Sequence, residues 1–173
     1  MAILDIIVAP DPRLKLKAKP VSIVDASVRK LMADMVETMH MAPGIGLASV
    51  QVGDLRSVIV VDVSDPDADR NPICMANPEL IWTSDEVHFH EEGCLSLPEQ
   101  YVEIKRPESI KVRYINEAGK KRELEADGLL AICIQHEMDH LNGVLFVDHI
   151  SSLKRGIILR KLAKIKKQEL INV

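Results

Sequence analysis

The segment IQHEMDHLNG, residues 134–143, contains two histidines four positions apart, His136 and His140, with Glu137 directly after the first. On an α-helix, residues i and i+4 lie one turn apart on the same side, so two imidazoles in this arrangement can bind one metal ion. Glu137 then lies close enough to act on a water molecule without being a ligand. The alternative is a helix whose histidines make ordinary hydrogen bonds. We expect a metal site, which needs a third ligand from elsewhere in the chain.

The helix itself is expected to be buried. From Gly128 onward, GLLAICIQHEMDHL is apolar on nearly all sides, which is typical of a helix enclosed by the rest of a domain. Buried imidazoles need partners, so burial favours metal binding.

The third ligand does not follow from the familiar downstream pattern, because a metzincin would have a histidine where this chain has Phe146. We prefer Cys94, in EEGCLSLPEQ. Gly93 there permits an unusual backbone conformation, and Pro98 is expected to end the strand, so that the thiol can turn toward a facing helix.

The other upstream candidates fit less well. Cys133 lies about 10 Å along the helix axis from His140, too far for one compact site. Cys74 has no acidic or histidine neighbours and is interpreted as a small hydrophobic residue. His88 and His90 alternate onto one face of a strand and can chelate, but they also suit an edge that faces solvent.

Length and composition indicate one domain. The 173 residues are 47% hydrophobic, enough for a continuous core, so we expect a single catalytic domain over residues 1–173. The three cysteines show no disulfide framework, and the N-terminus lacks the basic and apolar regions of a signal peptide. No stretch of about 18 apolar residues occurs. We therefore expect a reduced, cytoplasmic protein that does not enter a membrane.

The remaining patterns predict an α+β fold of mostly antiparallel sheets around the buried central helix. An apolar i, i+3, i+4 series from Val28 to Met39, preceded by Asp25, predicts an N-terminal amphipathic helix. PGIGLASVQVGD at 43–54 is interpreted as a glycine-rich loop. Strands are predicted at 57–63 and near 79–90, 101–105, 109–115 and 120–126, with a hairpin turn at 116–119.

The C-terminal segment differs from the rest in charge. The net charge is −4, yet residues 151–173 carry seven Lys or Arg and one Glu, which gives +6 there and −10 elsewhere. We expect a basic helix that begins at the first serines of this segment, with Ile158, Leu162 and Ile165 on one stripe. Such a helix suits an anionic partner, although a solvated helix face is the ordinary explanation of a charge run.

Three segments, GIGLASVQ (44–51), EEGCLSLP (91–98) and QHEMDH (135–140), resemble the signature motifs of the peptide deformylase family in order and spacing. The resemblance covers nearly the whole chain. It implies a metal-dependent hydrolase that removes the N-formyl group from the initiator methionine of nascent polypeptides. The resemblance to bacterial deformylases also suggests that the basic helix docks on ribosomal RNA, and we expect a monomer.

The resemblance also implies roles for individual residues. Glu137 handles protons, while Gln51 and the backbone N–H of Leu95 bind the developing oxyanion. The implied metal ligands are Cys94, His136 and His140. A Cys-His-His set accepts iron(II), zinc, nickel or cobalt, and the resemblance favours iron(II). An ion in such a site lowers the pKa of water from 15.7 toward about 7.

Substrate contacts are expected beside His136. Glu92 and Asp139 are expected to orient a ligand imidazole through their carboxylates. Plain core packing and surface solvation are the alternatives for these residues. The expected lining of a methionine-sized slot is Ile45, Gly46, Leu129, Ile132 and Cys133.

The chain departs from the family pattern at two places. Ser49 and Val50 precede Gln51 where the family usually has Ala-Pro, and Tyr101 stands where many bacterial members have Arg. Two other functions are compatible with parts of the sequence. An ordinary H-E-x-x-H metallopeptidase would need no cysteine ligand, and a ribosome- or RNA-binding module would use the basic tail alone.

Overall fold

A computed structural model describes residues 2–65 and 68–171 of the chain, with side chains described as far as Gln168. The ends of the predicted domain, residues 1 and 172–173, lie outside the described residues. The helices are α1 (Ala26–Met41), α2 (Gly128–Leu141) and α3 (Ser152–Ile171), with short 3₁₀ helices η1 (Pro12–Lys15), η2 (Ser49–Val52) and η3 (Phe146–His149). The strands are β1 (Gly46–Ala48), β2 (Val58–Val61), β3 (Ile73–Thr83), β4 (Val87–Cys94), β5 (Leu97–Pro107), β6 (Ser109–Ile115) and β7 (Lys121–Asp127).

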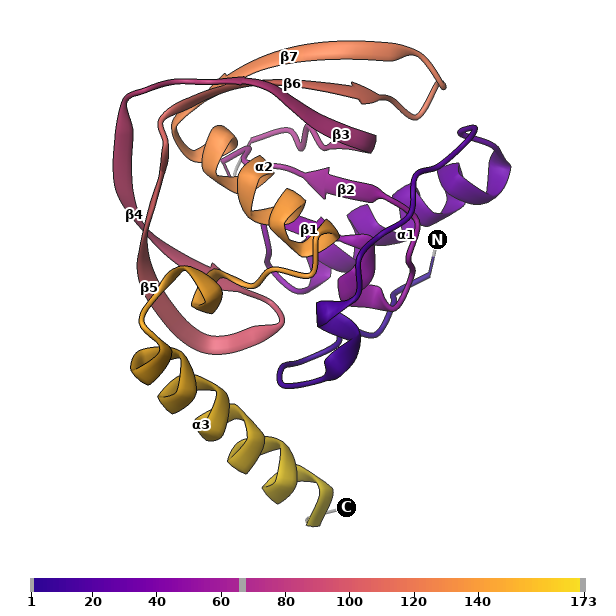
Figure 1. The fold of residues 1–173 in the computed structure, drawn as a ribbon. Coiled ribbons are helices and arrows are strands. Elements are labelled where there is room, and N and C mark those ends of the chain that lie inside the picture. The colour runs from indigo at the N-terminus through magenta and orange to yellow at the C-terminus, as the bar shows by residue number, and fades with distance from the viewer. Residues whose placement is uncertain (1, 66–67, 172–173) are drawn as a thin grey trace.

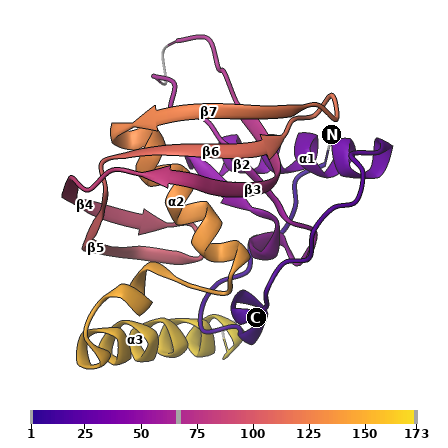
Figure 2. The same cartoon turned by 45° about the horizontal axis from the view of Figure 1, so that its top comes forward.

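The strands form two sheets. One has five strands in the order β1-β2-β3-β6-β7, the other is the β4–β5 hairpin, and every pairing in both sheets is antiparallel. Helix α2 lies between the five-stranded sheet and the hairpin (Figures 1 and 2). The predicted α+β fold with mostly antiparallel sheets is confirmed.

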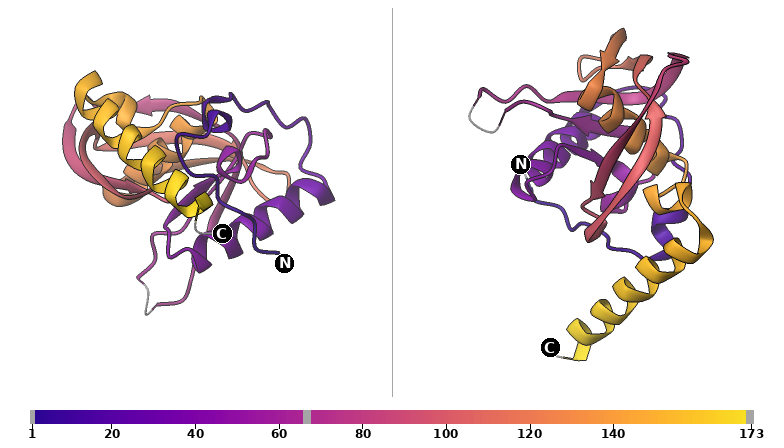
Figure 3. Two further views of the ribbon diagram at one scale, coloured as in Figure 1. Left: turned by 90° about the horizontal axis from the view of Figure 1, so that it is seen from below. Right: turned by 90° about the vertical axis from the view of Figure 1, so that its left-hand side faces the viewer.

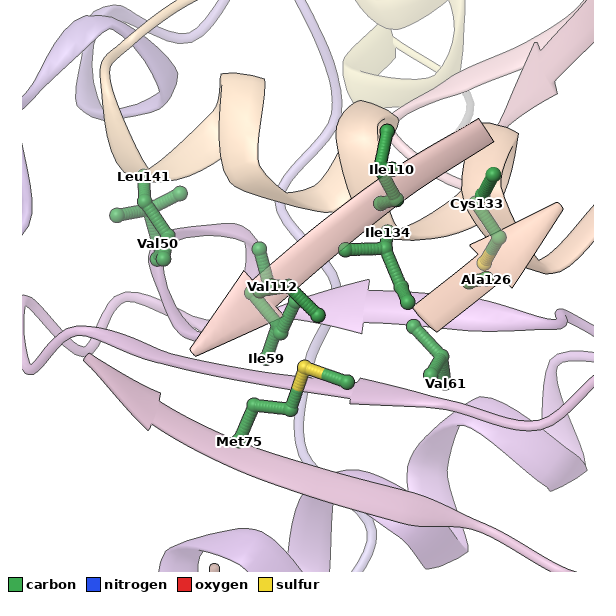
Figure 4. Close-up of a cluster of buried hydrophobic side chains, with 12 residues drawn as sticks. Val50, Ile59, Val61, Met75, Ile110, Val112, Ala126, Cys133, Ile134 and Leu141 are labelled. Atoms are coloured by element: carbon green, nitrogen blue, oxygen red, sulfur yellow. The ribbon is translucent and has the colours of Figure 1, made fainter. Parts of the chain in front are cut away.

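Two faces of α2 explain why its sequence is apolar on nearly all sides. Ile134 and Leu141 are seven residues apart, nearly two full turns, and therefore share a face. This face packs on the five-stranded sheet, where Ile134 lies among side chains such as Ile59 and Val112 (Figure 4). Full burial of one such side chain contributes about 1.5–3 kcal/mol. His136 is about 200° round the axis from Ile134 and faces the hairpin instead.

Helix α1 forms as its sequence pattern predicts. The Asp25 side chain accepts a hydrogen bond from the backbone N–H of Val28 at 2.9 Å, which caps the first turn. Met32, Met35 and Met39 are buried with residues of β2, so the apolar stripe covers one side of the five-stranded sheet.

The strand boundaries between residues 79 and 107 differ from the prediction. The strand expected near 79–90 is two strands, since β3 ends at Thr83 and β4 begins at Val87. Ser84 makes the break, because its hydroxyl donates to Glu86 O at 2.8 Å and turns the chain out of the first sheet. The expectation that Pro98 ends a strand was wrong. It is the second residue of β5, where a missing N–H is tolerated.

The predicted loop at 43–54 also contains secondary structure, namely β1 and η2. Strand β1 has only three residues and pairs with β2 alone, so it forms an edge of the five-stranded sheet. A strand this short carries too little alternation to be recognised from sequence.

Helix α3 lies outside the two sheets (Figure 3). Leu162 is buried with Leu14 and Phe146, as the predicted stripe requires, while Lys161 and Lys164 are exposed. Across residues 2–65 and 68–171, none of the helices has the length and apolar character needed to cross a membrane.

Candidate active site

Three side chains from two elements converge on one point. Cys94 is the last residue of β4, and His136 and His140 lie one turn apart on α2. The Sγ of Cys94 is 3.3 Å from Nε2 of His140, which is 3.2 Å from Nε2 of His136. Metal–nitrogen bonds of 2.0–2.1 Å in a tetrahedral site place neighbouring ligand atoms about 3.3 Å apart. The three atoms are therefore spaced as ligands of one ion.

A local irregularity in the hairpin aims Cys94 at the helix. The β4–β5 ladder shifts register between Glu92 and Cys94, and such a bulge redirects the side chain that follows. The unusual backbone conformation that Gly93 permits is not a positive φ, which Gly93 does not have. It is small for a different reason: a Cβ there would lie 2.7 Å from the ring of Tyr101, which crosses this part of the strand.

The two imidazoles differ in protonation. Burial lowers the pKa of His136, but hydrogen bonds with Cys94 and Glu92 outweigh it and raise this pKa well above its usual range. Nδ1 of His136 is 2.8 Å from Oε2 of Glu92, and since a carboxylate only accepts, Nδ1 carries a proton and Nε2 is the nitrogen that would bind an ion, with loss of its own proton. Burial lowers the pKa of His140 well below its usual range, which keeps this ring neutral. Its Nδ1 has no partner within the part of the chain that the structure describes. These residues fit a divalent metal.

Arg106 belongs to this site although the sequence analysis missed it. Its buried guanidinium donates to both carboxylate oxygens of Glu92, with Nη2 at 3.0 Å from Oε2. Burial alone would raise the pKa of Glu92, but hydrogen bonds from His136 and Arg106 outweigh it and hold the pKa at about 2. The sequence does contain a signal for Arg106. It is two residues after the apolar Ile104, so both side chains lie on the inward face of β5, where a charge needs a partner.

Asp139 does not contact either ligand imidazole. Its Oδ2 accepts from Nη1 of Arg106 at 2.9 Å and lies 2.8 Å from Nε2 of His149. The side chain emerges about 100° round the helix from His140, which turns it toward Arg106. We expected Asp139 to contact a ligand imidazole. Instead it contacts Arg106, which bonds Glu92, and Glu92 contacts His136.

Gln51 is held rigidly beside Cys94. Its Oε1 accepts from the backbone N–H of Ala48 at 2.8 Å, and its Nε2 donates to Ser96 Oγ at 3.0 Å and to Cys94 Sγ at 3.6 Å. Ser96 was not among the predicted site residues. The amide nitrogen is therefore fixed toward the sulfur.

The two departures before Gln51 leave this support in place. Ser49 is buried and donates its hydroxyl hydrogen bond to the carbonyl of Arg56, while Val50 packs in the core. The 3₁₀ turn is thus stabilised by a side-chain hydrogen bond and apolar contacts, without a proline.

Glu137 is buried beside the histidines with one oxygen unpaired. A Cβ on Gly46 would come within 2.4 Å of Glu137 Oε1, so only glycine leaves room for the carboxylate. Oε2 has no hydrogen-bond partner among the described residues. Burial raises the pKa of Glu137 to about 7, against the opposing charge of His136. A carboxyl group with such a pKa can both accept and return a proton near neutral pH.

A cavity of about 490 Å³ opens onto these groups. Leu129, Ile132 and Cys133 are not among its lining residues, although they lie on the face of α2 that carries His136, one to two turns before it. Its lining includes Pro43, Gly44, Ile45, Gly46, Gln51, Cys94, Leu95, Glu99, Tyr101, His136 and Glu137.

The other two cysteines pack away from the ligands. Burial raises the pKa of Cys133 well above its usual range, and its Sγ donates to the carbonyl of Ile45 at 3.3 Å. Burial also raises the pKa of Cys74 to about 11. His88 and His90 do not line the cavity either.

Comparison with known proteins gives a consistent result. Residues 3–156 match the sequence family described as polypeptide deformylase. A peptide deformylase from Methylocella silvestris is 56% identical over 170 residues, which cover 96% of this chain and 87% of the relative. A peptide deformylase from Agrobacterium fabrum is 49% identical and covers 95% of this chain and 96% of its own length.

Solved structures agree with the sequences. The crystal structure of peptide deformylase from Ehrlichia chaffeensis superposes with a TM-score of 0.93 at 39% identity and covers 98% of this chain and 99% of its own. The same enzyme in complex with actinonin gives a TM-score of 0.90 at 41% identity, with the same coverage of both chains. Sequence and fold together assign the chain, with its convergent cysteine and histidines, to the polypeptide deformylase family.

Proposed function

We propose that the chain removes the formyl group from the N-terminal methionine of nascent polypeptides at the cavity beside Cys94, His136 and His140. Removal of the formyl group from nascent peptides is the activity of this family, and the chain is a hydrolase of this class. The observation that best supports this location is the convergence of three ligand atoms next to the unpaired carboxylate oxygen of Glu137.

Iron(II) is the metal we propose, with zinc, nickel and cobalt as ions that the same ligands accept. When bound, the ion supplies Lewis-acid chemistry: it lowers the pKa of water toward about 7 and polarises the formyl carbonyl. The thiolate of Cys94 and the neutral imidazoles would hold it.

Glu137 acts first as the general base and then as the general acid. The carboxylate takes a proton from the attacking water, whose oxygen adds to the formyl carbon. It then gives this proton to the leaving amine as the C–N bond breaks, so that formate and a free N-terminus result. General acid–base catalysis of this kind contributes typically 10²–10⁴-fold in rate.

Two donors beside Cys94, Nε2 of Gln51 and the backbone N–H of Leu95, would stabilise the charge that develops on the substrate oxygen. The hydrogen bonds that the Gln51 amide makes with Ala48 and Ser96 orient it before the substrate arrives. One preorganised donor of this kind is worth about 2.7–4 kcal/mol in the transition state.

The peptide backbone is expected to bind along strand β1. This strand is an edge of the five-stranded sheet, and Gly46 at its start lines the cavity. An extended peptide can add to such an edge through main-chain hydrogen bonds, which are independent of its sequence. The methionine side chain would then lie against Ile45 and along the α2 face that carries Ile132 and Cys133.

We also propose that α3 binds ribosomal RNA and that the protein is a cytoplasmic monomer. The apolar stripe of α3 that includes Leu162 packs against residues such as Leu14 and Phe146. The basic side chains of α3 at Arg160, Lys161, Lys164 and Lys167 are exposed. Exposed cations on one helix suit a phosphate backbone.

Cys94→Ala should abolish metal binding, because two imidazoles alone leave the site short of charge and ligands. The measurement is elemental analysis of protein purified anaerobically without added metal. Cys74→Ala is the matched control and should keep one equivalent of metal per chain. Full metal content in Cys94→Ala would mean that another residue supplies the third ligand.

Glu137→Gln should keep the fold and the metal but lower kcat on a formyl-Met peptide by roughly 10²–10⁴, since it removes the proton carrier without removing a ligand. The exposed Glu91 on the hairpin offers the control, and Glu91→Gln should turn over normally. Loss of metal from Glu137→Gln, or a normal rate, would contradict the assignment.

Formyl-Met peptides should have a much higher kcat/KM than formyl-Asp peptides. A carboxylate in an apolar slot loses its hydration without gaining a partner. The comparison uses peptides that are identical beyond the first residue. Equal kcat/KM values would show that the first side chain does not enter the proposed slot, while leaving hydrolysis itself unaffected.

Reversal of the exposed charges on α3 should abolish salt-sensitive co-sedimentation with ribosomes and leave peptide hydrolysis intact. Truncation is unsuitable because it would expose the partners of Leu162. The reversed residues are Arg160, Lys161, Lys164 and Lys167. A control with the same charge change uses Lys105, Lys120, Lys121 and Arg122. Equal sedimentation of both variants would contradict the docking role.

A further inference from the structure

A second group of metal-binding side chains lies on the β4–β5 hairpin, where it curves round the outside of α2 (Figure 1). His88 and His90 are two residues apart on β4, so both project from the same face. Glu108 directly follows β5, and its backbone N–H donates to the carbonyl of Glu86 at 2.9 Å. This bond places the Glu108 carboxylate beside the first residues of β4.

The three ligand atoms have the spacing of a metal site. Nδ1 of His88 is 3.0 Å and Nε2 of His90 is 3.6 Å from Oε2 of Glu108. These distances bracket the value of about 3.3 Å expected between neighbouring ligands of a tetrahedral ion with 2.0–2.1 Å bonds. The group shares no residue with the cavity that contains Cys94.

Nδ1 of His88 lies at ion-pair distance from Oε2 of Glu108, but no contact with hydrogen-bond geometry joins the three side chains. Nε2 of His90 and Oε2 of Glu108 are both shielded from solvent, and neither has a hydrogen-bond partner among the described residues. Oε2 of Glu108 carries lone pairs, and the Nδ1–H tautomer of His90 presents one on Nε2, and an ion would satisfy both atoms. Two shielded atoms that approach one another without bonding leave room for a shared third partner.

Glu86 completes the arrangement. Its Oε1 lies 3.2 Å from Nε2 of His88. Because a carboxylate only accepts hydrogen bonds, Nε2 carries a proton in this contact, so that in the neutral ring the lone pair of His88 is on Nδ1, facing Glu108. Carboxylates that orient a ligand histidine in this way are common around metal ions.

We propose that His88, His90 and Glu108 form a second divalent-metal site, with Glu86 orienting His88. Two imidazoles, one carboxylate and an open fourth position for water suit zinc(II). The ion would join β4 to the residue that follows β5, and so would close the open end of the hairpin opposite Cys94.

The test is a zinc titration of the protein that already holds its ion at the Cys94 site. Equilibrium dialysis against zinc(II), followed by elemental analysis, should raise the total metal from one to two equivalents per chain. The first equivalent reports on the Cys94 site and the second on the hairpin, so failure of either assignment is distinguishable from failure of the other.

Two variants remove the hairpin ligands independently. His90→Ala and Glu108→Gln should each hold the total at one equivalent, with unchanged hydrolysis of a formyl-Met peptide as the check on folding. Glu86→Gln should lower the affinity of the second site for zinc by about 10–100-fold. The matched control is Glu103→Gln, an exposed carboxylate on the other face of β5, which should bind two equivalents.

Two results would overturn the proposal. If the unmodified protein stays at one equivalent, these side chains are only ion pairs facing solvent. If the second equivalent persists in both His90→Ala and Glu108→Gln, zinc binds elsewhere.

Discussion

The buried charge of Arg106 is the constraint on which the geometry of the active site depends. An unpaired guanidinium in this position would be strongly destabilising, by about 3–5 kcal/mol when one partner of a buried pair is lost. Glu92 must therefore stay ionised opposite it, and the same carboxylate receives the N–H of His136. The Arg106–Glu92 pair joins the two strands of the hairpin, and the further contacts Arg106–Asp139 and Glu92–His136 join the hairpin to α2. The last of these also determines that Nε2 of His136 faces Cys94.

Helix α2 connects this site to the core. Its Ile134 face is enclosed by the five-stranded sheet, so the opposite face, with His136 and His140, cannot rotate without disrupting that packing. The two histidines that we propose as ligands are held by the same contacts that stabilise the domain, rather than by a flexible loop. Such rigid support keeps catalytic groups within the narrow tolerances that they need.

Local patterns were sufficient for much of this structure. The i, i+4 spacing and the apolar series predicted α1 and α2, and Cys94 does lie beside the two histidines. The break at Ser84 and the full length of β5 were not predicted, because they depend on which strands pair. Arg106 was missed for the same reason, since its contact with Glu92 exists only in one register of the hairpin.

The unequal environments of the three thiols make one sulfur chemically distinct. Burial raises the pKa values of Cys133 and Cys74, so both carry almost no reactive thiolate at neutral pH. Cys94, by contrast, lines the open cavity. If Cys94 holds the ion as proposed, an alkylating reagent would compete with the metal for this one thiol, and the rate of covalent labelling would measure the fraction of molecules without an ion.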